Sequence, residues 1–283
     1  MPATTAAKRA AFRRLHESGC FVIPNPWDVG SARYLQHLGF KALATTSSGA
    51  AWTKGLPDNA LGLEAMLAHI GEIAAASDVP VNADFEGGYA GEPAGVAANV
   101  RRAIDTGVSG VSIEDSTGHG DKPLYEFTLA VERVKAARAA IDKSGSGVLL
   151  TARAECFLVG HPDPLKESLR RLEAYAAAGA DCLYARGPKS REHIQAIVKA
   201  VAPKPVNLLV GAPGLSVAEI ADLGVRRISV GGALARSAWT GFIRAAREIA
   251  EQGSFGGFAN ITPFAELDGF CATDARKSGK RRR

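Results

Sequence analysis

The chain has few cysteines and lacks several patterns that would place it in a familiar class. Its four cysteines form neither a CxxC pair nor a spacing typical of zinc sites, so we expect free thiols. No apolar run reaches the roughly 18 residues that span a bilayer, and residues 1–8 lack a signal-peptide core. We therefore expect a cytoplasmic protein with no membrane partner.

Excess charge is also absent from most of the chain. The net charge is +5, but six positive charges lie in the last eight residues, and without them the remainder carries −1. Runs of like charge at a terminus are usually solvated rather than ordered. We expect a disordered basic tail, and a nucleic-acid partner is not expected.

The composition is that of an ordinary folded enzyme, with 46% hydrophobic and 22% charged residues. A chain of 283 residues is long enough for one α/β barrel or two smaller domains. The pattern along the chain decides between them.

Short apolar runs alternate with amphipathic segments. We predict strands at 20–24, 42–46, 79–84, 110–114, 148–153, 182–185, 205–209 and 227–230. We predict helices at 29–38, 63–77, 94–106, 127–143, 164–178, 191–201, 216–223 and 234–251, several of which end at a glycine.

Eight β-then-α units predict a (β/α)₈ TIM barrel. We expect one barrel domain over residues 1–260, beginning with an N-terminal helix that ends near Gly19, and an extension over residues 261–283. A doubly wound open sheet is the alternative, but no GxGxxG motif opens the first unit.

In a TIM barrel the residues just past each strand form the active site. Asp84 and Glu86 follow the third predicted strand, and Glu114 ends the fourth. Carboxylates that converge on one point suit Mg²⁺ or Mn²⁺. We predict Asp84 as the direct metal ligand, with Glu86 and Glu114 acting through water; the alternative is a structural pairing of Asp84 and Glu86 with Arg153.

Other strand ends also carry polar side chains. The hydroxyls and N–H groups of Thr46, Ser47 and Ser48 could hold a substrate carboxylate, or form an ordinary turn. Arg153 could bind a carboxylate or an enolate with its planar fork, or pair structurally with Glu155 or Glu114. The remaining strand-end candidates are Arg186 and Asn207.

Three further features have open interpretations. Asp58 is either a helix cap or a supporting acid of the site. His119 lies in a glycine-containing loop that could close over the site, and is either a catalyst or a solvated side chain. The glycine-rich turns at 211–214 and 230–233 follow the last two strands, where many barrels bind phosphate.

Five motifs together resemble the isocitrate lyase and phosphoenolpyruvate mutase superfamily. They are PNPWD at 24–28, GLPD at 55–58, DFEGGY at 84–89, SIED at 112–115 and TARAE at 151–155. The resemblance implies a TIM barrel that binds Mg²⁺ at the third and fourth strand ends and often assembles as a homotetramer. It also implies a 2-oxo acid chelated to the metal, with its carboxylate at residues 46–48 and its oxo oxygen near Arg153.

The chain departs from the superfamily pattern at several positions. The loop at 116–120 lacks the catalytic cysteine of isocitrate and methylisocitrate lyases, and no asparagine lies between Asp115 and Tyr125 as in phosphonopyruvate enzymes. Arg186 stands where the mutases tend to have histidine, and Glu86 where most members have aspartate. This combination resembles the cysteine-lacking branch that contains oxaloacetate decarboxylase and lyases of substituted malates.

We therefore predict a metal-dependent carbon–carbon lyase or decarboxylase that acts on a small 2-oxo or 2-hydroxy dicarboxylate through a metal-stabilised enolate. Catalysis would fall to Arg153, Glu114, Asp58 and Arg186. Trp27 and Tyr89 would complete the substrate wall beside residues 46–48 and Asn207. A dimer or tetramer is expected. Carbon–phosphorus chemistry and a non-catalytic metabolite-binding barrel are the alternatives.

Overall fold

The computed structural model describes residues 3–118 and 120–279, and the side chains through residue 273. Its contacts divide the chain into two compact units. One covers residues 3–232 and the other begins at Ala233. The predicted domain boundary at residue 260 stays a prediction. None of the described helices combines the length and apolar character needed to cross a membrane.

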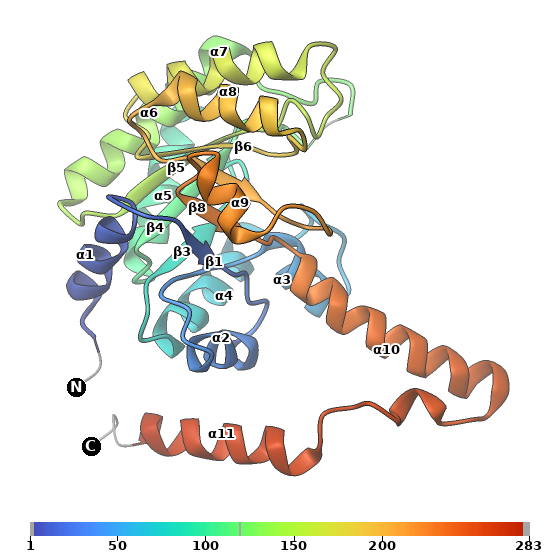
Figure 1. The fold of residues 1–283 in the computed structure, drawn as a ribbon. Coiled ribbons are helices and arrows are strands. Elements are labelled where there is room, and N and C mark those ends of the chain that lie inside the picture. The colour runs from blue at the N-terminus through green and yellow to red at the C-terminus, as the bar shows by residue number, and fades with distance from the viewer. Residues whose placement is uncertain (1–2, 119, 280–283) are drawn as a thin grey trace. The chain divides into compact units, whose positions relative to one another are not determined.

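The described residues of the first unit form eight parallel strands (Figure 1). They are β1 (Phe21–Ile23), β2 (Leu43–Ala44), β3 (Val81–Asp84), β4 (Gly110–Glu114), β5 (Leu149–Ala154), β6 (Cys182–Ala185), β7 (Asn207–Leu209) and β8 (Arg227–Ser229). They pair in the orders β2-β3-β4-β5-β6 and β1-β8-β7. The Ala44 N–H donates to Pro24 O at 3.1 Å and the Leu183 N–H to Pro205 O at 3.0 Å, which joins the two sheets into one cylinder.

Helices lie outside the strands (Figure 1). They are α2 (Val29–His37), α4 (Leu63–Ala76), α5 (Pro93–Asp105), α6 (Phe127–Ser144), α7 (Pro164–Ala177), α8 (Arg191–Val201) and α9 (Val217–Asp222). Their apolar faces bury residues such as Ile70, Val100 and Leu172 against the strands. The TIM barrel is confirmed, and the open doubly wound sheet is not found.

Helix α1 (Thr5–Leu15) is anchored at the end of the barrel opposite the carboxyl ends of the strands. Its Phe12 is fully buried, and an added Cβ at Gly110, the first residue of β4, would lie 2.7 Å from the Phe12 ring. The Lys8 ammonium group donates to the carbonyls of Ala74 and Ser77 at 3.0 and 3.1 Å, near the end of α4. The predicted N-terminal helix is therefore present.

The second unit contains α10 (Ala233–Gln252), a short 3₁₀ helix (Gly256–Phe258) and α11 (Phe264–Gly279). The predicted helix at 234–251 corresponds to α10, whereas α11 was not predicted. Large apolar side chains of this unit are exposed, including Phe242 at 61% and Phe264 at 83%. The expected disordered tail began at Arg276, but residues 276–279 belong to α11. Residues 280–283 and the side chains of Arg276 and Lys277 lie outside the described part.

Candidate active site

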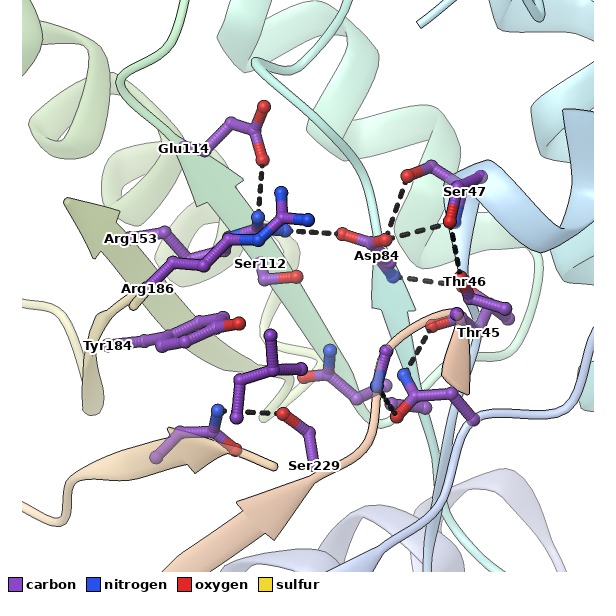
Figure 2. Close-up of a pocket in the computed structure, with 18 of the residues that line it drawn as sticks. Thr45, Thr46, Ser47, Asp84, Ser112, Glu114, Arg153, Tyr184, Arg186 and Ser229 are labelled. Carbon is purple, nitrogen blue, oxygen red and sulfur yellow. Dashed lines mark hydrogen bonds and ion pairs between the residues drawn. The ribbon is translucent and has the colours of Figure 1, made fainter. Parts of the chain in front are cut away.

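A cavity of about 250 Å³ opens among the carboxyl ends of the strands. Most of its walls are polar (Figure 2). Its lining includes Asn25, Thr45, Thr46, Ser47, Ser48, Asp58, Asn82, Asp84, Ser112, Glu114, Arg153, Tyr184, Arg186, Asn207, Arg227, Ser229 and Gly232. The cavity lies where the sequence predicts the active site.

Arg153 occupies the centre of the acidic cluster (Figure 2). Its Nη1 lies 2.7 Å from Asp84 Oδ1, and its Nη2 lies 2.8 Å from Glu114 Oε2 and 2.9 Å from Glu155 Oε1. The guanidinium is also 5.0 Å from the centre of the Tyr184 ring, close enough for a cation–π contact. One arginine therefore joins carboxylates from β3, from β4 and from the residue that follows β5.

The second carboxylate oxygen of Asp84 is held by the chain that follows β2. Asp84 Oδ2 accepts hydrogen bonds from the Ser47 N–H and hydroxyl, both at 2.9 Å. The Asp84 N–H donates to the Thr45 hydroxyl at 2.9 Å. Asp84 is therefore fixed in position from two sides of the cavity.

The segment predicted to bind a substrate carboxylate through its hydroxyl and N–H groups is helical. Residues Ser47–Thr53 form the short helix α3, with Thr46 as its N-cap. The Ser47 N–H already binds Asp84, and the Gly49 N–H donates to Thr46 Oγ1 at 3.3 Å. The hydroxyls of Thr46 and Ser48 lie 3.2 Å apart on the cavity wall. This segment therefore offers the cavity hydroxyl groups more than free N–H groups.

The cluster contains more acids than its cations can balance. Among the described residues, the guanidinium groups that interact with Asp58, Asp84, Glu86, Glu114 and Glu155 are those of Arg153 and Arg186. Burial, with Asp84 nearby, raises the pKa of Glu86 to about 7. Burial also raises the pKa of Glu114. The charge of Arg153 lowers this pKa, and the charges of Glu155 and Asp84 raise it. Loss of surrounding water and the charge of Asp84 raise the pKa of Asp58.

These residues fit a divalent cation in chemistry, although their side chains are arranged around Arg153. In the described part of the chain no three acidic, histidine or cysteine side chains converge as a ready metal cluster. However, Glu86 Oε1 is buried without a hydrogen bond of good geometry, although the Tyr89 hydroxyl interacts with this carboxylate. Hard oxygen ligands in excess of the local positive charge are what Mg²⁺ or Mn²⁺ binds. The predicted metal ligands Asp84 and Glu114 meet at Arg153, and Glu86 lies behind the cavity wall.

Arg186 is the second cation at the mouth and lies beside Arg153 (Figure 2). Its Nη1 is 3.7 Å from Glu155 Oε2, and 32% of its side chain is exposed. Because this ion pair is long, the Arg186 guanidinium retains donors for an anionic ligand.

The remaining predicted residues fall in different places. Asp58 lines the cavity, but Trp27 and Tyr89 do not. The Tyr89 ring packs against Phe85 with centroids 5.1 Å apart. Asn207 is the first residue of β7 rather than its last, so it lies deep in the barrel. His119 lies outside the described residues, so its role and the closure of its loop stay predictions.

The polar floor of the cavity was missed by the sequence analysis. It includes Ser112 of β4 and Arg227 and Ser229 of β8. Alternate residues of a strand share a face, so a strand predicted at 227–230 placed Arg227 and Ser229 together. That pattern was the available signal that a charged side chain points into the barrel.

A model of the family described as phosphoenolpyruvate phosphomutase matches residues 12–250. The chain belongs to this family. The match covers both the barrel and most of α10, and it confirms the resemblance drawn from the five motifs.

Relatives of this phosphomutase-family protein include both lyases and a decarboxylase. It is 32% identical over 232 residues to oxaloacetate decarboxylase from Paraburkholderia xenovorans, covering 79% of this chain and 75% of that one. A Burkholderia cenocepacia structure, provisionally assigned as a lyase/mutase, has a TM-score of 0.91 at 46% identity and covers 95% and 97% of the two chains. The structure of 2,3-dimethylmalate lyase has a TM-score of 0.84 at 29% identity and covers 99% of each chain.

Proposed function

We propose that this protein is a carbon–carbon lyase that acts on a small 2-oxo or 2-hydroxy dicarboxylate. The observation that carries the proposal is the Arg153 guanidinium, buried among acids from three strand ends at a cavity of about 250 Å³. A cavity of this size suits a metabolite of a few carbons. The names of the decarboxylase and dimethylmalate lyase relatives support the same class of substrate.

A divalent metal is part of this proposal. Asp84 would bind Mg²⁺ or Mn²⁺ directly, with Glu86 and Glu114 nearby, and Asp58 as a further acid. The bound cation would supply Lewis-acid polarisation of the substrate oxygen. The excess of carboxylates and the buried Glu86 Oε1 support this assignment.

The side chains of the cavity would orient the substrate. The Thr46 and Ser48 hydroxyls, which lie on the cavity wall, would donate to its C1 carboxylate. Arg153 would stabilise negative charge that develops on the C2 oxygen, because its position is fixed before the reaction. Arg186 would add positive charge at the mouth.

Two reactions use these roles. In decarboxylation of a 2-oxo diacid, the C3–C4 bond breaks and C4 leaves as CO₂. The electron pair of that bond forms the C2–C3 double bond while the C2 carbonyl pair moves onto oxygen, and water then protonates the enolate at C3. In cleavage of a 2-hydroxy diacid, a carboxylate such as Glu114 or Glu86 takes the hydroxyl proton as the C2–C3 bond breaks. The first reaction needs no dedicated acid, which agrees with a loop at 116–120 that lacks cysteine.

Carbon–phosphorus chemistry is the second candidate, and the description of the matched family favours it. A screen separates the two: about a dozen 2-oxo and 2-hydroxy diacids, together with phosphonopyruvate, are incubated with enzyme and Mg²⁺, and products are identified by mass spectrometry. We expect a 2-oxo acid from at least one diacid, above the rate with Mg²⁺ alone. Turnover of phosphonopyruvate only would contradict the proposed function.

A further inference from the structure

The floor of the cavity contains a buried arginine whose partners are all neutral. Arg227 is 3% exposed, at the start of β8. Its Nε donates to Asn207 Oδ1 at 2.8 Å, and its Nη2 donates to the Thr151 hydroxyl at 3.0 Å. Its Nη1 lies 3.3 Å from His16 Nε2. These contacts fix the plane of the guanidinium.

The charge of Arg227 is not balanced by an acid. Among the residues that the structure describes, no carboxylate forms an ion pair with it, in contrast to Arg153 with three. Arginine stays protonated in proteins, so burial cannot be relieved by loss of a proton. A buried cation without a counter-ion is costly. The guanidinium has five N–H groups, and its three contacts leave donors for an anion.

This arginine can be reached from the proposed active site. Arg227, Asn207 and Ser229 line the same cavity as Asp84 and Arg153. The Asn207 amide also donates to Ser229 Oγ at 3.0 Å, which extends the polar floor. Thr151, the partner of Arg227, and Arg153 are two residues apart on β5, so they share a face about 6–7 Å apart along the strand. A four- or five-carbon diacid has a comparable span.

We propose that Arg227 binds the distal carboxylate of a 2-hydroxy diacid, and that this carboxylate remains on the product. The inference rests on the proposed function and narrows it. A carboxylate that leaves as CO₂ becomes neutral and loses its attraction to the guanidinium. Binding it to Arg227 would stabilise the substrate more than the transition state, which slows decarboxylation.

Cleavage between C2 and C3 instead increases the negative charge of the distal carboxylate. The hydroxyl proton moves to a carboxylate of the cluster, and the O–H electron pair forms the C2 carbonyl of a 2-oxo acid or glyoxylate. The C2–C3 electron pair moves onto C3 and into the distal carboxylate, whose negative charge grows. A proton from water then adds to C3 and gives the second carboxylic acid. Arg227 is placed to stabilise that added charge.

A matched pair of ligands tests the assignment. Malate and 2-hydroxybutyrate share the C1 carboxylate and the C2 hydroxyl, but only malate has a distal carboxylate. Their dissociation constants are measured by calorimetry with Mg²⁺ present. We expect the wild-type protein to bind malate at least about 30-fold more tightly, equivalent to about 2 kcal/mol. Arg227→Met should reduce this ratio to about threefold or less, and Arg227→Lys should retain part of it.

Arg186→Met is the matched control, because Arg186 is the rival cation in the same cavity. Through the lost charge at the mouth it should weaken malate and 2-hydroxybutyrate alike, and leave the ratio of their dissociation constants largely unchanged. A folded Arg227→Met protein that keeps the full preference, or loss of the preference in Arg186→Met alone, would overturn the proposal. Circular dichroism and thermal unfolding of each variant establish folding.

A crystal of the wild-type protein with malate and Mg²⁺ gives the answer even if Arg227→Met does not fold. We expect the C4 carboxylate at the Arg227 guanidinium. A chloride ion there, with the C4 carboxylate at Arg186, would contradict the proposal. Diacid turnover with a malate preference that does not depend on Arg227 would refute this inference alone. An Arg227-dependent preference without turnover of any diacid would refute the proposed function alone.

Discussion

Arg153 shows how one side chain can organise a site. Its fork contacts three carboxylates, and each contact is within 2.9 Å, so the guanidinium cannot rotate without breaking an ion pair. Lysine carries the same charge but has a single ammonium group that cannot make these contacts together.

Arg153→Lys should therefore lower kcat/KM for the preferred diacid by at least about 100-fold, since misplaced electrostatic stabilisation commonly costs about 3 kcal/mol. Steady-state kinetics with Mg²⁺ measure the effect, and thermal unfolding serves as the control for folding. Near-normal kinetics would remove Arg153 from the site.

His16 lies beneath the floor and is held neutral. Its Nδ1 is 2.8 Å from Phe12 O, and its Nε2 faces the Arg227 guanidinium. Burial and the charge of Arg227 lower the pKa of His16 to about 3, while a histidine in the unfolded chain titrates near 6.5. Between these values the unfolded chain binds more protons, so the protein loses stability as pH falls.

From pH 7 to pH 5 this group alone should lower the free energy of unfolding by about 2 kcal/mol. His16→Gln keeps a donor and an acceptor but does not titrate. We expect its loss of stability over the same pH range, measured by urea unfolding, to be smaller than that of the wild-type protein by that amount. Equal losses in the two proteins would mean that His16 titrates normally when folded.

At the scale of elements, the spacing of apolar residues along the sequence predicted most helices and strands of the barrel. The helix expected at 127–143 is Phe127–Ser144, and the strand expected at 110–114 is Gly110–Glu114. Glycines also ended helices as expected, and Gly39 and Gly179 adopt φ of +91° and +99°, where other residues are strained.

The features that the sequence analysis did not predict were missed for physical reasons. The segment after β2 reads as a turn because serine and glycine favour turns, but Thr46 caps it as a helix. The sequence placed acids at the ends of β3 and β4, yet it could not show that Arg153 would bridge them. Nor could it show that Arg227 lacks an acidic partner among the described residues, because such contacts join residues far apart in the chain.

The junction of α1 with β4 depends on the absence of a side chain at Gly110. A Cβ there would lie 2.5 Å from Asn82 Oδ1 and 2.7 Å from Phe12. We expect Gly110→Ala to lower the free energy of unfolding by about 1–3 kcal/mol, as overpacking does in cores. Gly62→Ala is the matched control, because its added Cβ meets nothing within 4 Å. Equal stabilities of the two variants in urea unfolding would contradict this packing.

At the scale of the whole molecule, the second unit leaves apolar side chains uncovered. Besides Phe242 and Phe264, Phe255 and Ile261 are each 63% exposed. Exposed apolar patches on this scale commonly mark protein interfaces. They support the expectation of a homo-oligomer, in which a second copy covers them.

We predict a dimer or larger assembly by light scattering after size exclusion. Phe242→Glu should shift it toward the monomer, because a buried charge without a partner is costly. Leu38→Glu, at a residue 58% exposed on the barrel unit, is the control and should not change the mass. A monomeric wild-type protein at micromolar concentration would contradict the prediction.

The most direct test of the account is the metal dependence of turnover in Asp84→Ala and the wild-type protein. With the diacid identified by the screen, kcat/KM is measured with Mg²⁺, with Mn²⁺ and after chelation, each corrected for the rate without enzyme. We predict that chelation abolishes wild-type turnover, that either metal restores it, and that Asp84→Ala stays folded but inactive under all three conditions. Turnover that survives chelation, or a wild-type rate in Asp84→Ala, would contradict the claim that these carboxylates form the catalytic centre.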